Sequence, residues 1–473
     1  MNNILLKALS KKNKWIDNKN KDYDDESDGD ITSEDELEIS KSYVPSIFND
    51  QYVCLKYLGK GTFCRVWLVY DLVNKNYFAM KHFFSDYYED SNYEIKFNCL
   101  FSNKENSRII KQYDYFTHNK NERCIIYELL GITLNDILSI HDKNVGNTCY
   151  DSDDGSDDGS DDGSDDGSDD GDENKYKPIP FELIVKIIKE ILLCTEELHE
   201  KNIVNTDIKI ENLLLNNISP KLVDYINKID SLNISEKYES LITQNLPENY
   251  SSMDKMKKKK IKRKVKQRSV KQLKEYLENT NIYNILENED QEQDNTRANI
   301  YEQLQNYTIK MIDLGNAESL DNKQQDEIMM RVYRPPENIM GSYYDCKADI
   351  WSIGCIAYEL FTGNFLFKVS RDGDNIDRDR EHLHQMYEYL GKIPKELTDN
   401  CEFKDNLFDS KGRILKHKNC EYTSIDKLLI EETDYTSEIV LKISHFLKKM
   451  LEYNLQYRYT ASEALTDPLL FSM

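Results

Sequence analysis

The sequence predicts an α+β fold of two lobes, a small one rich in strands and a larger helical one, with two long low-complexity inserts. Runs that alternate apolar and polar residues begin near Gln51 and indicate β-hairpins. Beyond residue 180, apolar residues recur at helical spacing. Removing the two segments of biased composition leaves about 300 residues, which we interpret as one split domain.

The overall charge is strongly acidic, with 62 Lys and Arg against 86 Asp and Glu in 473 residues, a formal net charge of −24. This balance argues against whole-chain binding to nucleic acid or anionic lipid and permits attraction of basic partners. No run approaches the roughly 20 apolar residues that span a membrane. The ten cysteines lack metal-ligand spacing and predict reduced thiols in an intracellular compartment, cytoplasmic or nuclear.

The order of these blocks gives the expected domain organisation. A disordered acidic arm occupies residues 1–50, because it has too few apolar residues to form a core. The remaining segments are a first lobe at 51–130, the hinge and start of the second lobe at 131–216, an acidic insert within it at 145–177, a charged insert at 217–307, and the rest of the second lobe at 308–473.

The two inserts differ in charge. An Asp-Asp-Gly-Ser repeat runs from residue 151 to 171 without an apolar residue and predicts a flexible, self-repelling loop. The second insert contains eleven basic residues within 255–271. A solvated, partly helical insert is the simplest interpretation of this basic segment. The alternatives are an import signal, a docking segment for nucleic acid or another partner, and an intramolecular partner for the acidic repeat.

In the first lobe, the glycines at 59 and 61 predict a hairpin whose backbone N–H groups can approach phosphates. Lys81 is an isolated cation in an apolar strand, where an unpaired charge is costly. Glu94, in a predicted helix, could pair with it. The residues of this nucleotide-binding candidate are Leu58, Gly59, Lys60, Gly61, Thr62, Phe63, Cys64, Arg65, Val66, Ala79, Lys81 and Glu94.

The second lobe holds a sharper pattern. Asp207, Lys209 and Asn212 stand at spacing 0, +2 and +5 between a predicted helix and an apolar strand. Asp313 follows at the end of a later strand, before a turn. Mg²⁺ prefers oxygen ligands, so Asn212 and Asp313 are candidate metal ligands.

Taken in order, these motifs resemble the signature set of eukaryotic-type protein kinases and imply the two-lobed kinase fold. The resemblance implies ATP and Mg²⁺ as substrate and cofactor, with Lys81 on the α- and β-phosphates and Glu94 positioning Lys81. Asp207 would accept the substrate hydroxyl proton, and Lys209 would neutralise the transferring phosphate.

Within the kinases the chain is most similar to the SR-protein kinase family, a branch of the CMGC group. The segments that carry this resemblance are TDIKIEN (206–212), DLGNA (313–317), CIIYELLG (124–131) and the run at 345–395. The family implies phosphorylation of Ser, and also Thr, in Arg/Ser-rich proteins. We expect a monomer that does not contact membranes. It also implies that the backbone of Glu128 and Leu130 binds adenine, with Tyr127 as the gatekeeper residue. The segment 206–212 would be the catalytic loop, braced by Asp349, and Arg458 would pair with Glu337.

The activation segment, residues 313–337, has few side chains that could be phosphorylated. No Ser, Thr or Tyr lies between Ser319 and Tyr333, and Thr206 occupies the position where many kinases place the Arg that pairs with a loop phosphate. This predicts a loop that is ordered without phosphorylation and therefore constitutive activity.

Substrate charge is predicted from an acidic cluster before a helix expected to begin near His382, a region that forms an acidic docking groove in the resembled family. Its acids are Asp372, Asp374, Asp377, Asp379 and Glu381, but Arg371, Arg378 and Arg380 lie among them, and an ordinary solvated loop is an equal alternative.

Three departures from the family pattern bear on turnover: Asn205 for His, Asn98 at an apolar position, and Met330 for Thr. None removes a charge that phosphoryl transfer needs. The alternative to an active kinase is a pseudokinase or scaffold that binds nucleotide and partners with little turnover.

Overall fold

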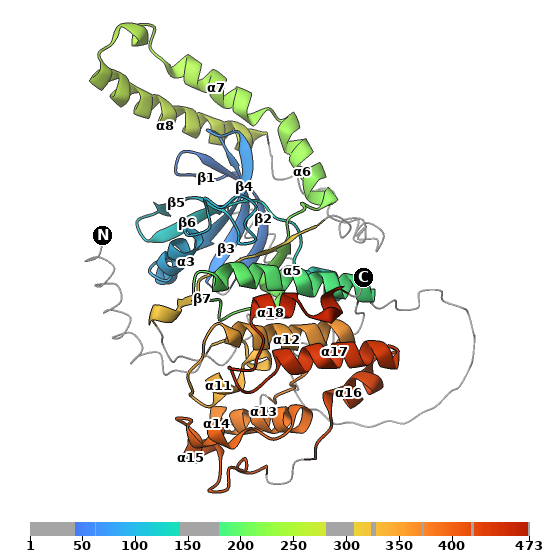
Figure 1. The fold of residues 1–473 in the computed structure, drawn as a ribbon. Coiled ribbons are helices and arrows are strands. Elements are labelled where there is room, and N and C mark those ends of the chain that lie inside the picture. The colour runs from blue at the N-terminus through green and yellow to red at the C-terminus, as the bar shows by residue number, and fades with distance from the viewer. Residues whose placement is uncertain are drawn as a thin grey trace, which may run out of the picture. The chain divides into compact units, whose positions relative to one another are not determined.

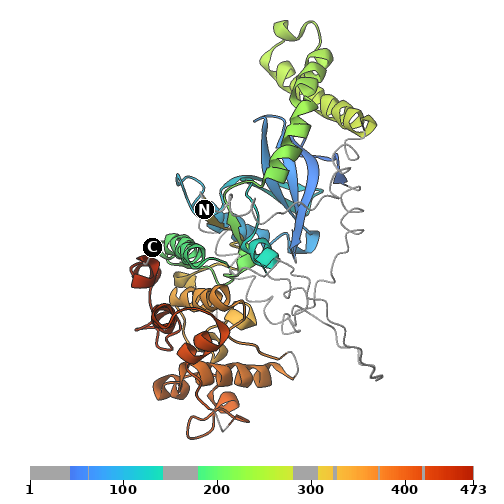
Figure 2. The same ribbon diagram turned by 90° about the vertical axis from the view of Figure 1, so that its right-hand side faces the viewer.

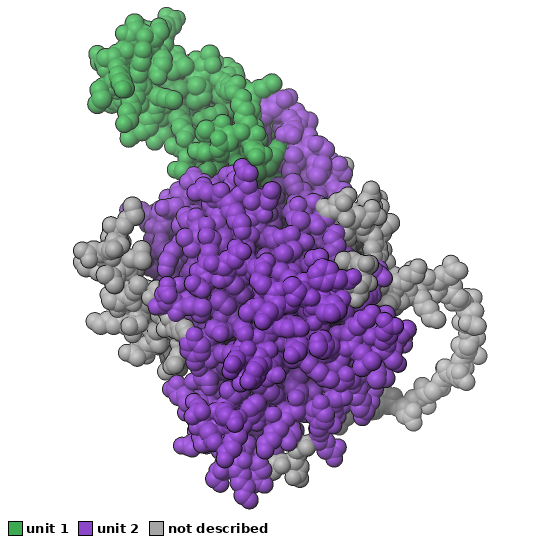
Figure 3. Space-filling model, viewed as in Figure 1, with its two compact units in different colours: residues 1–84, 235–287 green, residues 85–234, 288–473 purple. Residues whose placement is uncertain are grey.

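The protein is described by a computed structural model, and the described residues are 43–61, 63–141, 179–280, 307–322, 328–370, 373–417 and 421–471. They divide into two compact units (Figure 3): unit 1 takes residues 1–84 and 235–287, and unit 2 takes residues 85–234 and 288–473. The Asp-Asp-Gly-Ser repeat, Thr62 and most of the expected N-terminal arm lie outside the described residues.

Unit 1 contains an antiparallel sheet in which each strand pairs with the next along the chain. Its core includes Trp67, Leu68 and Met80, all fully buried. The glycine-containing hairpin is formed as expected, with Gly61 opposite Cys64 and irregular register beside Gly59. The strands are β1 (Ile47–Phe48), β2 (Tyr52–Gly61), β3 (Cys64–Asp71) and β4 (Asn76–Phe83).

A pair of antiparallel helices completes unit 1 (Figures 1 and 2). They are α7 (Ile234–Asn245), whose first residue falls in unit 2, and α8 (Lys255–Asn279), which contains the basic segment. Lys75, in the turn between β3 and β4, forms an ion pair of 2.6 Å with Glu239 of α7. The helical pair is therefore tied to the sheet of its own unit, and the basic segment is a regular helix.

Unit 2 holds short strands that frame the candidate site. Strand β8 pairs antiparallel with β9, and β7 pairs antiparallel with β10. The loop that joins β7 to β8 carries Asp207 and Asn212, and the turn that joins β9 to β10 carries Asp313. The strands are β5 (Gln112–His118), β6 (Glu122–Tyr127), β7 (Ile203–Val204), β8 (Leu213–Leu215), β9 (Ile309–Met311) and β10 (Glu318–Ser319).

The helices of unit 2 other than α6 share one hydrophobic core, centred on α5 and α12. Ile188 and Leu192 of α5 and Trp351 and Ile353 of α12 are fully buried in it. The helices are α3 (Ser91–Asn98), α4 (Leu134–His141), α5 (Phe181–His199), α6 (Pro220–Ser231), α11 (Pro336–Ile339), α12 (Lys347–Thr362), α13 (Asn375–Leu390), α14 (Lys395–Asp399), α15 (Lys404–Leu407), α16 (Ile425–Glu432), α17 (Ser437–Met450) and α18 (Ala461–Leu465).

The α+β class is confirmed, and two boundaries are wrong. The arm expected to be disordered over 1–50 contains strand β1, because Ile47 and Phe48 pair with β2. The helix expected to begin near His382 begins at Asn375, because the Asp374 side chain accepts a hydrogen bond from the Asp377 backbone and caps the helix. Because the helix begins at Asn375, the acids at 377, 379 and 381 lie in it and not before it. Asp377, in the first turn, suits the positive end of the helix dipole. No helix in the described part of the chain is long and apolar enough to cross a membrane.

Candidate active site

The loop between β7 and β8 brings Asp207, Lys209 and Asn212 together. Lys209 Nζ lies 3.3 Å from Asp207 Oδ2. The Asn212 amide nitrogen donates to the backbone oxygen of Asp207 at 3.0 Å and to its Oδ2 at 3.2 Å. Because its nitrogen is held by Asp207, the amide oxygen of Asn212 is the atom left to bind a metal.

The turn after β9 brings Asp313 to the same place. Asp313 has a left-handed backbone (φ 59°), and its Oδ1 accepts a hydrogen bond from the Gly315 backbone at 3.2 Å. Asn316 Nδ2 lies 3.4 Å from Asp207 Oδ2, which joins this turn to the catalytic loop. Asp207, Lys209, Asn212 and Asp313, predicted from the sequence, therefore form one cluster within unit 2.

Burial and the neighbouring charges shift the pKa values of Asp207 and Lys209. Burial raises the pKa of Asp207; the Lys209 ammonium lowers it and the Asp313 carboxylate raises it. Burial acts to lower the pKa of Lys209, but the charges of Asp207 and Glu211 outweigh it, and the net shift is upward. Two carboxylates close enough to repel one another form a site that favours a cation.

Asp349, from the first turn of α12, braces the catalytic loop as expected. It accepts hydrogen bonds from the backbone N–H groups of Asn205 (2.8 Å) and Thr206 (3.1 Å), and His199 Nε2 lies 2.9 Å from it. Thr206, the residue just before Asp207, has a left-handed backbone (φ 64°), which is strained for a β-branched residue. Three contacts on one buried carboxylate hold that strained backbone in place.

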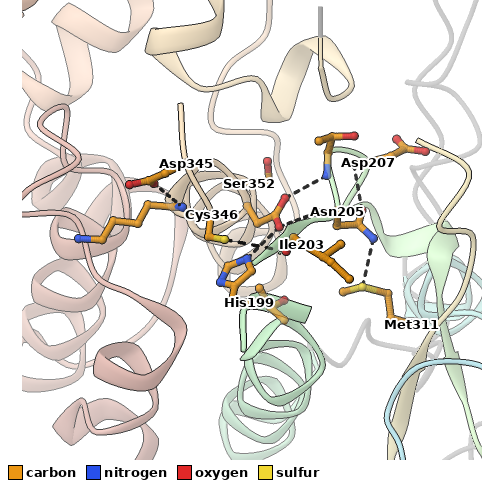
Figure 4. A network of polar contacts seen from close by, with 12 residues as sticks. His199, Ile203, Asn205, Asp207, Met311, Asp345, Cys346 and Ser352 are labelled. Atoms are coloured by element: carbon orange, nitrogen blue, oxygen red, sulfur yellow. Dashed lines mark hydrogen bonds and ion pairs between the residues drawn. The ribbon is translucent and has the colours of Figure 1, made fainter. Parts of the chain in front are cut away.

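The Asn205 side chain makes specific bonds where the family has His (Figure 4). Its Oδ1 accepts from the Asp207 backbone N–H at 2.9 Å, and its Nδ2 lies 3.2 Å from Met311 Sδ of β9. Asn205 is buried and so links the catalytic loop to the strand that leads into Asp313. The substitution keeps a connection between the two halves of the cluster.

A buried polar triad behind Asp313 was not expected. Tyr127, the last residue of β6, donates its hydroxyl hydrogen to Glu94 Oε1 at 2.6 Å and accepts from Asn98 Nδ2 at 2.9 Å. All three side chains are buried. A Cβ added to Gly315 would lie 3.1 Å from Asp313 Oδ1 and 3.8 Å from Glu94 Oε2, so Glu94 borders the cluster. Asn at an otherwise apolar position opposite a Tyr was the sequence signal for this triad.

The hinge residues are fixed by polar contacts. Glu128 accepts from the Lys111 backbone (2.7 Å) and from Lys310 Nζ (2.6 Å), while Leu130 is buried. Gly131 lies so close to the segment that follows β8 that an added Cβ would be 1.9 Å from the Asn217 carbonyl oxygen, so only glycine fits there.

The other nucleotide-binding candidates lie in unit 1. A Cβ added to Gly59 would meet nothing within 4 Å, so the backbone of the hairpin is open on that side. Lys81 is in β4, opposite Val66 of β3, with its Nζ 5.1 Å from the Phe83 ring centroid. The remaining residues of this group are in β2, β3 and the turn between them, apart from Ala79 in β4 and Thr62, which lies outside the described residues.

The expected Arg458–Glu337 pair is confirmed. The guanidinium makes two hydrogen bonds to the carboxylate, at 2.6 and 2.8 Å, and a third to the Lys347 backbone oxygen. Both side chains are buried. Met330 packs partly buried against the core of unit 2.

Comparison with known proteins identifies the class. The family model described as protein kinase domain matches residues 52–245 and 293–470, so the chain belongs to the protein kinase family. The unmatched stretch between these two ranges falls within the second insert.

The relatives narrow the type. The chain is 26% identical over 440 residues to the serine/threonine-protein kinase SRPK of Physarum polycephalum. This alignment covers 90% of this chain and 87% of that protein. It is 33% identical over 162 residues to the serine/threonine-protein kinase SKY1 of Saccharomyces cerevisiae and to the SRSF protein kinase 3 of Mus musculus. These two alignments cover 34% of this chain and 22% and 28% of those proteins. The protein is therefore a serine/threonine protein kinase with the protein kinase fold, and it is similar to kinases of the SR-protein kinase type.

Protein kinases use ATP together with Mg²⁺, and the oxygen atoms of the cluster are suitable ligands for this ion. Mg²⁺ is usually bound by one or two carboxylates together with substrate phosphates and water, not by a cage of protein ligands. The cluster offers the carboxylate of Asp313, the amide oxygen of Asn212 and the nearby Asp207, all hard oxygen donors.

Proposed function

We propose that this kinase transfers the γ-phosphate of ATP to Ser and Thr in Arg/Ser-rich proteins and that it does so without phosphorylation of its activation segment. The observation that carries the proposal is the cluster of Asp207, Lys209, Asn212 and Asp313, which retains every charge that phosphoryl transfer needs. Basic specificity and constitutive activity rest on further contacts.

Each residue of the cluster has a proposed role. Asp207 orients the substrate hydroxyl and accepts its proton, and Lys209, bonded to that carboxylate, neutralises charge on the transferring phosphate. Asn212 and Asp313 would hold Mg²⁺, which would offset the negative charge of the nucleotide phosphates. In unit 1 the open backbone at Gly59 and the side chain of Lys81 are the groups that would bind the phosphates.

The support for constitutive activity is a set of uncharged contacts on Thr206. Its hydroxyl donates to the Asn316 carbonyl at 2.7 Å, and its own carbonyl accepts from the Met329 backbone at 2.8 Å. Thr206 thus bonds to the activation segment at two points, Asn316 and Met329. In kinases that need loop phosphorylation, an Arg–phosphate pair does this work.

Two carboxylates beside the catalytic loop support basic substrates. Glu211, next to Asn212, is exposed, and Glu359 of α12 accepts a hydrogen bond from the Tyr333 hydroxyl at 2.7 Å. Burial raises the pKa of Glu359 to about 7, and the charge of Glu211 adds to the rise. A guanidinium placed between them would relieve this repulsion through charge-assisted hydrogen bonds.

A second acidic feature lies on α13, where an open groove of about 540 Å³ is lined by Asp377, Glu381 and Glu388 together with Lys368, Lys416 and His384. Asp377 is already paired with Lys416 (2.5 Å) and Arg380 (2.6 Å). A substrate arginine must therefore compete for Asp377, and we assign docking mainly to Glu381 and Glu388. Asp372 and Arg371 lie outside the described residues.

The test compares phosphate transfer from labelled ATP to an Arg–Ser repeat peptide and to a Gln–Ser peptide of equal length. We expect the Arg–Ser peptide to be favoured at least about tenfold in kcat/KM, and the preference to shrink in Glu211→Gln and Glu359→Gln but not in Glu396→Gln, an exposed carboxylate far along the chain. Equal use of both peptides would refute basic specificity and leave the kinase intact.

Two controls separate the remaining statements. Asp207→Ala should abolish transfer; if the unmodified chain shows no more transfer than this variant, the protein is a pseudokinase. Phosphatase treatment should leave the rate unchanged, and a large fall would overturn constitutive activity.

A further inference from the structure

The proposed function leaves the basic helix α8 without a role. Between Lys255 and Arg268 the helix carries ten Lys and Arg and no acidic residue. The described residues of unit 1 together hold eighteen Lys and Arg against eight Asp and Glu, a net charge of +10 in a chain whose total is −24. Unit 1 therefore differs in sign from the rest of the protein.

The helix is held rigidly by its own unit. Val265, Ser269, Leu273 and Leu277 form a buried stripe at intervals of four residues. Asn245 at the end of α7 donates to Ser269 Oγ (2.9 Å) and Gln272 Oε1 (2.7 Å). With these residues buried, the segment does not present the extended, accessible backbone that a linear import signal requires.

The basic side chains face outward. Eight of the ten are exposed, and Lys258 and Lys266 are partly buried. Among the described residues, Lys257 alone of the ten has a carboxylate within 4 Å, that of Asp254. Many of the others stand four residues apart, as Lys255, Lys259 and Arg263 do, an arrangement in which like charges repel. An anionic ligand would relieve this repulsion.

We propose that the exposed face of α8 docks on the phosphate backbones of duplex DNA, with the helix in the major groove. Ten charges along thirteen rises of about 1.5 Å give one charge per roughly 2 Å, close to the one per about 1.7 Å of duplex DNA. An extended acidic peptide offers at most one charge per about 3.3 Å. The charge density therefore matches a duplex better than an acidic protein segment.

Shape and composition favour the same ligand. A helix about 10–12 Å across fits the roughly 12 Å wide major groove of B-DNA, whereas the major groove of A-form RNA is too narrow. The segment has no aromatic residue on which single-stranded bases could stack. Eight of the ten cations are Lys, which bind phosphates as point charges, so binding is expected to be independent of base sequence.

The experiment measures binding of the full-length chain to a fluorescent DNA duplex of about 24 base pairs, by anisotropy, between about 50 and 200 mM salt. The test variant is Lys259→Gln/Lys260→Gln/Arg263→Gln/Lys264→Gln. The matched control replaces four exposed lysines of unit 2, Lys392, Lys395, Lys411 and Lys427, by Gln. Circular dichroism and the rate of peptide phosphorylation report that each variant is folded.

We expect the test variant to lose at least about tenfold in affinity and its slope of log K against log salt to be shallower by about 3, while the control changes by less than about twofold. An equal loss in both variants would overturn the proposal. So would tighter binding of labelled polyglutamate or of phosphatidylserine vesicles than of the duplex, because either would assign the surface to an acidic protein or a membrane.

Discussion

Glu94 shows how a single side chain in this kinase is positioned by its neighbours. Its carboxylate is held by the Tyr127 hydroxyl, which Asn98 also contacts, so an apolar position of the family has become part of a polar triad. Burial and the Glu94 charge raise the pKa of Tyr127 well above its usual value, so the hydroxyl remains a donor across the working range of pH.

Tyr127→Phe tests this triad. Removing the hydroxyl takes away the hydrogen bonds that it makes with Glu94 Oε1 and Asn98 Nδ2 in a buried site, and we expect a loss of about 1–3 kcal/mol in unfolding free energy and about tenfold in kcat. Adding Asn98→Leu should restore part of the stability, because both partners of the Asn98–Tyr127 bond are then apolar, but not kcat, because Glu94 still lacks the hydroxyl. Recovery of kcat together with stability would mean that the hydroxyl is merely structural. Tyr422→Phe, at an exposed tyrosine, is the control.

Glu359 provides a test that depends on pH. Because burial raises its pKa to about 7 from an ordinary 4.5, the folded protein keeps a proton that the unfolded chain releases between these values. The stability contributed by Glu359 is therefore lost as pH rises from about 4.5 to 7. We expect Glu359→Gln, relative to the unmodified protein, to gain about 2 kcal/mol on going from pH 5 to pH 8, measured by urea unfolding. A difference that does not vary with pH would contradict this assignment.

At the scale of elements, buried polar anchors connect segments that are distant in sequence. Arg458, near the C-terminus, bonds Glu337 of α11 and the Lys347 backbone at the start of α12. Both members of the pair are buried, so neither charge can turn to water if its partner is lost.

Arg458→Ala is expected to cost about 3–5 kcal/mol in unfolding free energy, because it leaves the Glu337 carboxylate buried and unpaired. Arg458→Met combined with Glu337→Gln should be less damaging than Arg458→Ala alone. Thermal unfolding of the three proteins decides the question, and a double variant no more stable than the single one would show that shape, not charge, dominates this contact.

The elements also show how far the sequence could be interpreted. Helices α5 and α12 and strands β2 and β3 were predictable because their apolar spacing is strong. The start of α13 was missed because it is determined by one capping side chain, Asp374, in a run dense with charge. The cluster of Asp207, Lys209, Asn212 and Asp313 could be found from spacing within single motifs. The triad on Glu94 joins residues about thirty positions apart and needed the packing of α3 against its neighbours.

At the scale of the whole molecule, charge is unevenly distributed along the chain. The segment 151–171 contributes eleven Asp and no apolar residue, while α8 is strongly basic. A segment without apolar side chains adds little to a hydrophobic core, so its contribution is expected to be electrostatic.

Deletion of residues 151–171 should leave the melting temperature unchanged within about 2 °C, because no core residue is lost. It should reduce the salt dependence of KM for an Arg–Ser peptide, since the acidic field that attracts basic substrates at about 0.1 M salt is screened near 1 M. Peptide kinetics at both salt concentrations measure this, and an unchanged salt dependence would exclude an electrostatic role for the repeat in substrate binding.

The threonine at 206 has a consequence for how such an enzyme can be controlled in a cell. If, as proposed, the uncharged contacts of Thr206 order the loop without phosphorylation, there is no loop phosphate for a phosphatase to remove, and the enzyme would lack that rapid way of being turned off. Its output would then follow the amount of protein synthesised, its rate of degradation and the supply of substrate brought to it.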